Sequence, residues 1–84
     1  MVSNRYTKKI YVHILDACSN GAGKTQIVYE CNLNFRAFES HMDNLIRAGL
    51  IRVETVDCRS HYFTTDKGRE VLSRLNALIE MLSL

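Results

Sequence analysis

The chain has 84 residues, of which 46% are hydrophobic and 24% are charged, the usual balance of one small globular domain. This balance argues against disorder and against a second domain. Eleven basic and nine acidic residues give a net charge of +2, so charge alone only weakly favours an anionic partner. A domain of this size buries only about 60–65% of its unfolded surface, so pairing with a second copy would add stability.

Neither membrane insertion nor secretion is expected. No apolar run reaches the roughly 20 residues of a membrane span, and the first residues lack the apolar core of a signal peptide. The three cysteines, Cys18, Cys31 and Cys58, are odd in number and contain no C-x-x-C pair, which argues against a disulfide framework and a zinc site. We expect a cytoplasmic protein. An intermolecular disulfide through Cys58, which lies in a predicted loop, stays open as an alternative to free thiols.

Three helices are predicted in the first part of the chain. Apolar residues recur at helical spacing over residues 5–20, before a segment rich in glycine. A short second helix is expected over residues 25–31. Asn34 is suited to capping a third helix over residues 34–48, and Gly49 is suited to ending it in a left-handed conformation. The buried face of this third helix is predicted to hold Phe38, Met42, Leu45 and Ile46.

The period of the apolar pattern then changes from that of a helix to that of a strand. Residues 50–64 alternate on both sides of a polar turn, which predicts a β-hairpin. Thr65 is a good N-cap for a last helix over residues 66–84. The glycine at position 68, in the first turn of this helix, predicts a close approach to a neighbouring element, since glycine otherwise costs a helix about 1 kcal/mol.

The order helix, helix, helix, hairpin, helix is that of the α+β winged helix-turn-helix fold. Residues 31–51 resemble the turn and recognition helix of archaeal winged helix-turn-helix regulators and chromatin proteins, and end in their L-I-x-x-G-L-I motif. Residues 62–68 resemble the Y-x-x-T-x-K-G motif that closes their two-stranded wing. The resemblance covers nearly all of the chain. Such proteins are common in archaea and in their viruses or plasmids. The resemblance therefore implies that the protein is located in the cytoplasm of a prokaryotic cell, or in the cytoplasm of the host cell if the protein is viral.

The resemblance implies that the helix over residues 34–48 enters the major groove of double-stranded DNA. Arg36 is the leading candidate for a base or phosphate contact, because it lies in the first turn and its planar guanidinium suits guanine or phosphate. The alternative is an ordinary solvated arginine. The outward positions expected to contact DNA from this helix are Asn34, Phe35, Arg36, Ser40 and Arg47.

Further basic and acidic residues affect this surface. Lys24 and Thr25 are expected at the start of the second helix, with Thr25 as its cap, where phosphate contacts are common. Arg59 is expected at the tip of the wing, near the minor groove or the DNA backbone. Glu39 and Asp43 are acidic where relatives often carry lysine or neutral polar residues, so they should weaken binding and reduce its salt dependence.

The last helix is predicted to form a dimer. Its apolar stripe is longer than a three-helix core of this size can cover, and its spacing fits a helix–helix seam. A second copy, antiparallel across a two-fold axis, would cover the stripe and place two recognition helices on one face. The alternative is a helix folded back over its own core. The residues expected at the dimer interface are Leu75, Leu78, Ile79 and Leu82.

Other chemistry finds little support in the sequence. Residues 21–25 end like a phosphate-binding loop but follow a helix rather than a strand, and the cysteines and His41 lack the spacing of a metal site. We therefore expect no enzyme, cofactor, metal or small-molecule effector. The favoured function is a dimeric regulator of transcription. A nucleoid-type architectural protein and a winged-helix module that binds protein stay open as alternatives.

Overall fold

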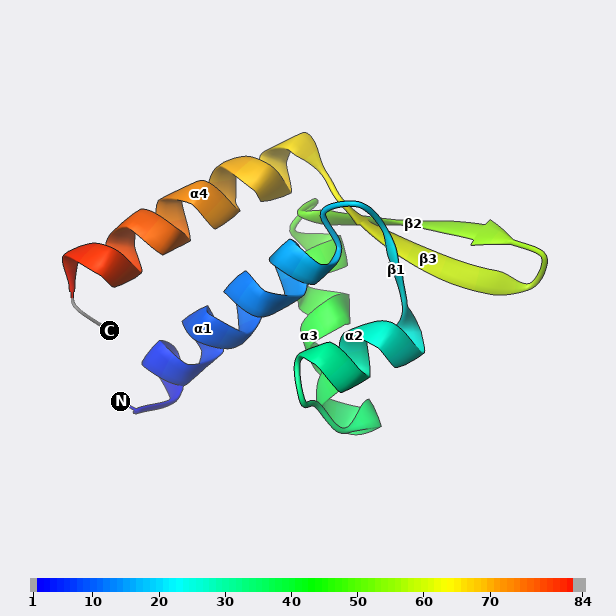
Figure 1. The fold of residues 1–84 in the computed structure, drawn as a ribbon, viewed down its shortest axis with the longest axis horizontal. Helices are drawn as coiled ribbons and strands as arrows, with labels where there is room; N and C mark the ends of the chain where they lie inside the picture. Colours follow the sequence, from blue (N-terminus) through cyan, green and yellow to red (C-terminus); the bar gives the residue numbers. More distant parts are fainter. Residues whose placement is uncertain (1, 83–84) are drawn as a thin grey trace.

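The computed structural model describes residues 2–82, with side chains from Lys9 to Leu82. Figure 1 shows α1 and α4 side by side and the β2–β3 hairpin projecting beyond the helices at the opposite end from both termini. The expected winged helix order is confirmed. The elements are α1 (Val2–Ala17), β1 (Ala22–Gly23), α2 (Lys24–Glu30), α3 (Phe35–Arg47), β2 (Ile51–Val56), β3 (Arg59–Thr64) and α4 (Asp66–Met81).

The wing sheet has three strands, so the expectation of two strands was wrong. Strand β1 pairs antiparallel with β3, with Ala22 opposite Tyr62, and the strand order is β1-β3-β2. The backbone N–H of Thr64 also donates to the carbonyl of Cys18, 3.0 Å away, which holds the chain after α1 against β3. A strand of two residues is too short to show the alternation by which a sequence predicts strands.

Several helix ends differ from the expected bounds. Helix α1 begins at Val2 rather than at residue 5, and ends at Ala17, before the turn over residues 18–20. Gly23, not Thr25, is the N-cap of α2, and it supplies no side-chain hydrogen bond. Helix α3 begins at Phe35 because Asn34 caps it as expected: the Asn34 Oδ1 accepts from the backbone N–H of Ala37 at 2.7 Å. The expected end of the last helix at residue 84 lies outside the described residues.

The core lies where α1, α2, α3 and the base of the wing meet. Phe38, Met42 and Leu45 are buried as expected, whereas Ile46 is 38% exposed, so its expected burial was wrong. Ile46 is rotated by about 100° from Leu45 around α3, which carries its side chain away from the core. The buried hydrophobic residues are Ile10, Ile14, Leu15, Cys18, Ala22, Ile27, Phe38, Met42, Leu45 and Ile51.

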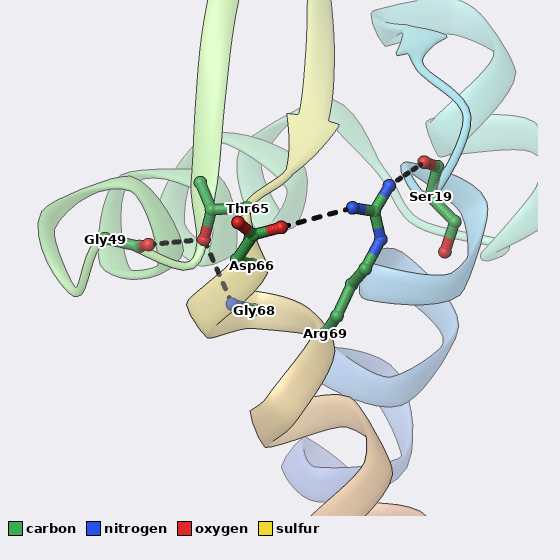
Figure 2. Close-up of polar contacts among 6 residues, drawn as sticks. All are labelled: Ser19, Gly49, Thr65, Asp66, Gly68 and Arg69. Atoms are coloured by element: carbon green, nitrogen blue, oxygen red, sulfur yellow. Dashed lines mark hydrogen bonds and ion pairs between the residues drawn. The ribbon is translucent and has the colours of Figure 1, made fainter.

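A joint of hydrogen bonds ties the end of α3 to the start of α4 (Figure 2). The Thr65 hydroxyl donates to the carbonyl of Gly49 at 2.7 Å and accepts from the backbone N–H of Gly68 at 3.0 Å, so it caps α4 and holds the end of α3 together. The backbone N–H of Thr65 donates to the carbonyl of Leu50 at 2.9 Å. Gly49 has a φ of 78°, the left-handed conformation expected at this position.

The first turn of α4 lies close against the chain that leaves α3. A Cβ at Gly68 would lie 2.2 Å from the carbonyl oxygen of Leu50, which confirms the expected close approach. Arg69, one residue further, donates to the carbonyl of Ser19 at 3.0 Å and pairs with Asp66 at 3.5 Å, as Figure 2 shows. The start of α4 is therefore fixed against the ends of both α3 and α1.

Candidate nucleic-acid interface

The exposed face of α3 is opposite its buried face. Arg36, Ser40, Asp43 and Arg47 are all exposed. They recur at intervals of four and three residues, which places them on one side of a helix. Among residues 9–82, no ion pair joins Arg36 to a carboxylate. Arg36 therefore presents its guanidinium from the first turn of α3, where side chains reach furthest into a major groove.

Two of the predicted basic residues are paired with the two acidic residues of α3. The Nζ of Lys24 lies 3.0 Å from Oε2 of Glu39, and the guanidinium of Arg47 lies 2.9 Å from Oδ2 of Asp43. Exposed ion pairs contribute only about 0.2–1 kcal/mol, so a phosphate group can displace either carboxylate at small cost. The acidic residues thus reduce the positive potential of this surface without blocking it.

Two aromatic rings of α3 lie close to the amine of Lys24. It lies 5.1 Å from the centre of the Phe35 ring and 5.6 Å from that of Phe38. Phe38 in turn contacts Tyr62 of β3 edge to face, with ring centres 5.6 Å apart. Burial is the main reason that the pKa of Tyr62 is raised; the carboxylate of Glu39 raises it further. Lys24 thus contacts side chains of α3, one of which, Phe38, packs in turn against the wing.

A surface hollow of about 500 Å³ lies between the start of α2 and strand β3. It brings together Lys24, Thr25 and Arg59, three predicted DNA-contacting residues that are far apart in the sequence. Arg59 lies next to the wing tip, in line with the expectation: it is the first residue of β3 and pairs with Val56 across the tight turn of Asp57 and Cys58, whose φ values are 52° and 64°. The other lining residues are Gly23, Gln26, Ser60 and His61.

Comparison with known proteins fits this geometry. The sequence profile of the winged helix-turn-helix family matches residues 4–83. The chain belongs to this family. The resemblance to archaeal winged helix-turn-helix proteins is confirmed by the likeness to Sso10a-2, a DNA-binding protein from Sulfolobus solfataricus, with a TM-score of 0.86 and 24% identity over 90% of this chain and 80% of that protein. A comparison with curated proteins gives no match.

Two transcriptional regulators share the winged helix-turn-helix architecture. BldR from Sulfolobus solfataricus has a TM-score of 0.75 and 25% identity over 89% of this chain. A MarR-family regulator from Silicibacter pomeroyi has the same TM-score, identity and coverage of this chain. This chain spans 60% of BldR and 51% of the MarR-family protein.

Two predicted DNA-contacting residues have additional structural roles in this winged helix. The side-chain oxygen of Asn34 is engaged in capping α3, which leaves its amide nitrogen for other contacts. Phe35 is 58% exposed although it packs beside Lys24. Gln26 and His61 also line the hollow, and neither was among the predicted DNA-contacting residues. His61 lies there because β3 pairs with β1, which places it opposite Gly23, and no local pattern predicts that pairing.

The predicted dimer residues lie along the far half of α4. Leu75 and Ile79 are half-buried, while Leu78 is 39% and Leu82 55% exposed. Ile79 also lines a hollow of about 340 Å³ with residues of α1. Helix α1 therefore covers one side of the stripe and leaves the other side open to solvent.

The thiols of this winged helix differ in environment. Burial raises the pKa of the Cys18 thiol to about 12, and burial also raises that of the half-buried Cys31, so both are poor nucleophiles at neutral pH. Cys58 is exposed at the turn of the wing. Within residues 2–82, no three His, Cys, Asp or Glu side chains gather as metal ligands would, and no helix has the length and apolar character needed to cross a membrane.

Proposed function

We propose that this protein binds double-stranded DNA as a homodimer and regulates transcription, with α3 in the major groove and the wing along the backbone. The main support is the convergence of Lys24 and Arg59 in one hollow, next to the exposed first turn of α3 with Arg36. Polar side chains and cations set in a concave surface suit a phosphate backbone. Sso10a-2 is described as a DNA-binding protein and BldR as a transcriptional regulator, which favours the same role here.

The charges of this surface predict its salt dependence. This surface carries four cations and two carboxylates of α3, which gives it a net charge of +2 (four minus two); the cations are Lys24, Arg36, Arg47 and Arg59. Each neutralised phosphate contributes about −0.9 to the slope of log affinity against log salt. A dimer that uses only Arg36 and Arg59 of each chain should give a slope of about −4, and one that uses all four cations a slope of about −7.

Dimerisation through α4 is the second part of the proposal. Leu78, Met81 and Leu82 are 39%, 81% and 55% exposed on the far half of this helix. An antiparallel second copy would remove these apolar side chains from water, at about 25 cal/mol for each Å² buried. Sedimentation should give a dimer for the wild type. The variant Leu82→Glu should shift it toward monomer, and Ser73→Glu, at another exposed α4 position, should not.

Fluorescence anisotropy with a random duplex library and with genomic fragments, at two salt concentrations, tests the DNA-binding role. We expect binding at low salt that Arg36→Ala weakens and that Arg74→Ala, an exposed arginine of α4, leaves unchanged. A regulator should prefer its site over random DNA by about 10³ or more, whereas an architectural protein should not. Absence of binding to any duplex at low salt would refute the proposal and favour a protein partner.

A further inference from the structure

The first turn of α3 presents two neighbouring side chains of opposite chemistry. Arg36 is a cation with five hydrogen-bond donors, and Phe35 is an apolar ring that is 58% exposed. One turn later Phe38 is 1% exposed and fills the core, so Phe35 is not needed for that packing. An exposed aromatic residue at the end of a recognition helix requires a different explanation.

Contacts around Phe35 hold the ring at this surface. The amine of Lys24 lies 5.1 Å from the ring centre, and the same amine pairs with Glu39, one turn after Phe35 on α3. Asn34, the preceding residue, is fixed by its cap to Ala37. Phe35 therefore starts α3 from a fixed backbone, with one part of its ring against a cation and more than half of the side chain open to solvent.

The major groove offers one group that suits such a ring. Base edges there present hydrogen-bond donors and acceptors, and the C5-methyl of thymine is the apolar exception. Phenylalanine has no hydrogen-bonding group, so a polar base edge or a phosphate would lose water against its ring without a replacement bond. The thymine methyl group has no hydrogen bonds to water to lose, and its burial against the ring is favourable.

We propose that Phe35 is a specificity-determining residue that contacts the methyl group of a thymine, beside the base pair contacted by Arg36. This inference rests on the proposed DNA binding. Successive Cα atoms are about 3.8 Å apart and successive base pairs about 3.4 Å apart. The two side chains should therefore contact base pairs that are neighbours or that have one base pair between them. Each half-site thus contains a thymine within two base pairs of the position that Arg36 contacts.

Removal of single thymine methyls tests this contact. The full chain selects its sites from a random duplex library, and each thymine of a selected duplex is then replaced by deoxyuridine, which lacks only the methyl. We expect one thymine in each half-site at which the replacement weakens wild-type binding about threefold to fivefold, the effect of one buried methyl group. In Phe35→Ala the same replacement should have no effect, and in Phe35→Leu an intermediate one.

Tyr29→Ala is the matched control, because Tyr29 is another exposed aromatic residue, 87% accessible at the end of α2. This variant should keep the wild-type response to uracil, and circular dichroism should show every variant folded. The inference is overturned if no thymine methyl matters to the wild type, or if its removal costs Phe35→Ala as much as the wild type. Wild-type affinity that does not change when thymine is replaced by deoxyuridine would refute this contact alone. Absence of binding to any duplex would refute DNA binding itself.

Discussion

Replacing Gly68 by alanine should destabilise the protein, although alanine is the better helix former. The added Cβ would lie 2.2 Å from the carbonyl oxygen of Leu50 and 2.7 Å from Cγ2 of Thr64. A carbon and a carbonyl oxygen normally approach no closer than about 3.3 Å, so the start of α4 must move by about 1 Å. The obstacle at Leu50 is backbone, which cannot rotate away as a side chain can.

Three contributions set the size of this effect. Overpacking of this kind costs typically about 1–3 kcal/mol. The displacement also stretches the 2.9 Å bond from the Thr65 N–H to the Leu50 carbonyl, and a hydrogen bond is worth about 1 kcal/mol. The helical preference of alanine returns about 1 kcal/mol. We therefore expect Gly68→Ala to lower the free energy of unfolding by about 1–3 kcal/mol, and Tm by at least about 4 °C.

Urea and thermal unfolding followed by circular dichroism measure this change, at one fixed protein concentration because the proposed dimer makes stability depend on it. Gly23→Ala is the matched control. A Cβ there meets nothing within 4 Å, and the φ of −86° is accessible to any residue, so its effect should stay within about 0.5 kcal/mol. A Gly68→Ala protein as stable as the wild type, or more stable, would show that the joint is looser than the structure describes.

Three further predictions concern charge, capping and pH. Glu39→Gln should free the amine of Lys24, raising DNA affinity and steepening its salt dependence in anisotropy titrations, and unchanged affinity would contradict the role of the pair. Thr65→Ala should cost about 1 kcal/mol in urea unfolding through loss of the cap, whereas Thr65→Ser should retain most of the stability. Burial lowers the pKa of His41 from its ordinary value of 6.5, so the unfolded chain takes up this proton first and stability should fall as pH drops below about 6.5. In His41→Phe, which preserves a ring against Tyr11, this part of the pH dependence should vanish, and its persistence would assign it to another group.

The features that the sequence predicts correctly are mostly local. Asn34 caps α3 through a backbone N–H three residues away, and the left-handed Gly49 ends the same helix. The Thr65 cap is equally local. Each depends on a few neighbouring residues and on backbone preferences that a short segment already carries.

The features missed by the sequence depend on contacts between distant segments. The pairing of Lys24 with Glu39 joins two helices, and no spacing rule of a single helix predicts it. The hollow forms only because β1 joins the sheet and brings the start of α2 to Arg59. The candidate DNA surface could thus be predicted residue by residue, but not its internal neutralisation or its concave shape.

The hydrogen bonds around Thr65 also have a consequence for the arrangement of the operator. Because Gly49 and Gly68 share the Thr65 hydroxyl, α3 and α4 cannot swivel independently about the hairpin. In the proposed homodimer, the distance and the relative rotation of the two recognition helices are then fixed by the rigid connection of each α3 to its α4. One base pair inserted between the half-sites turns them by about 35° relative to each other, since a turn of DNA holds about 10–10.5 base pairs. A rigid dimer cannot rotate its recognition helices to match the displaced half-sites. The operator should therefore tolerate substitutions at its centre much better than changes in its length.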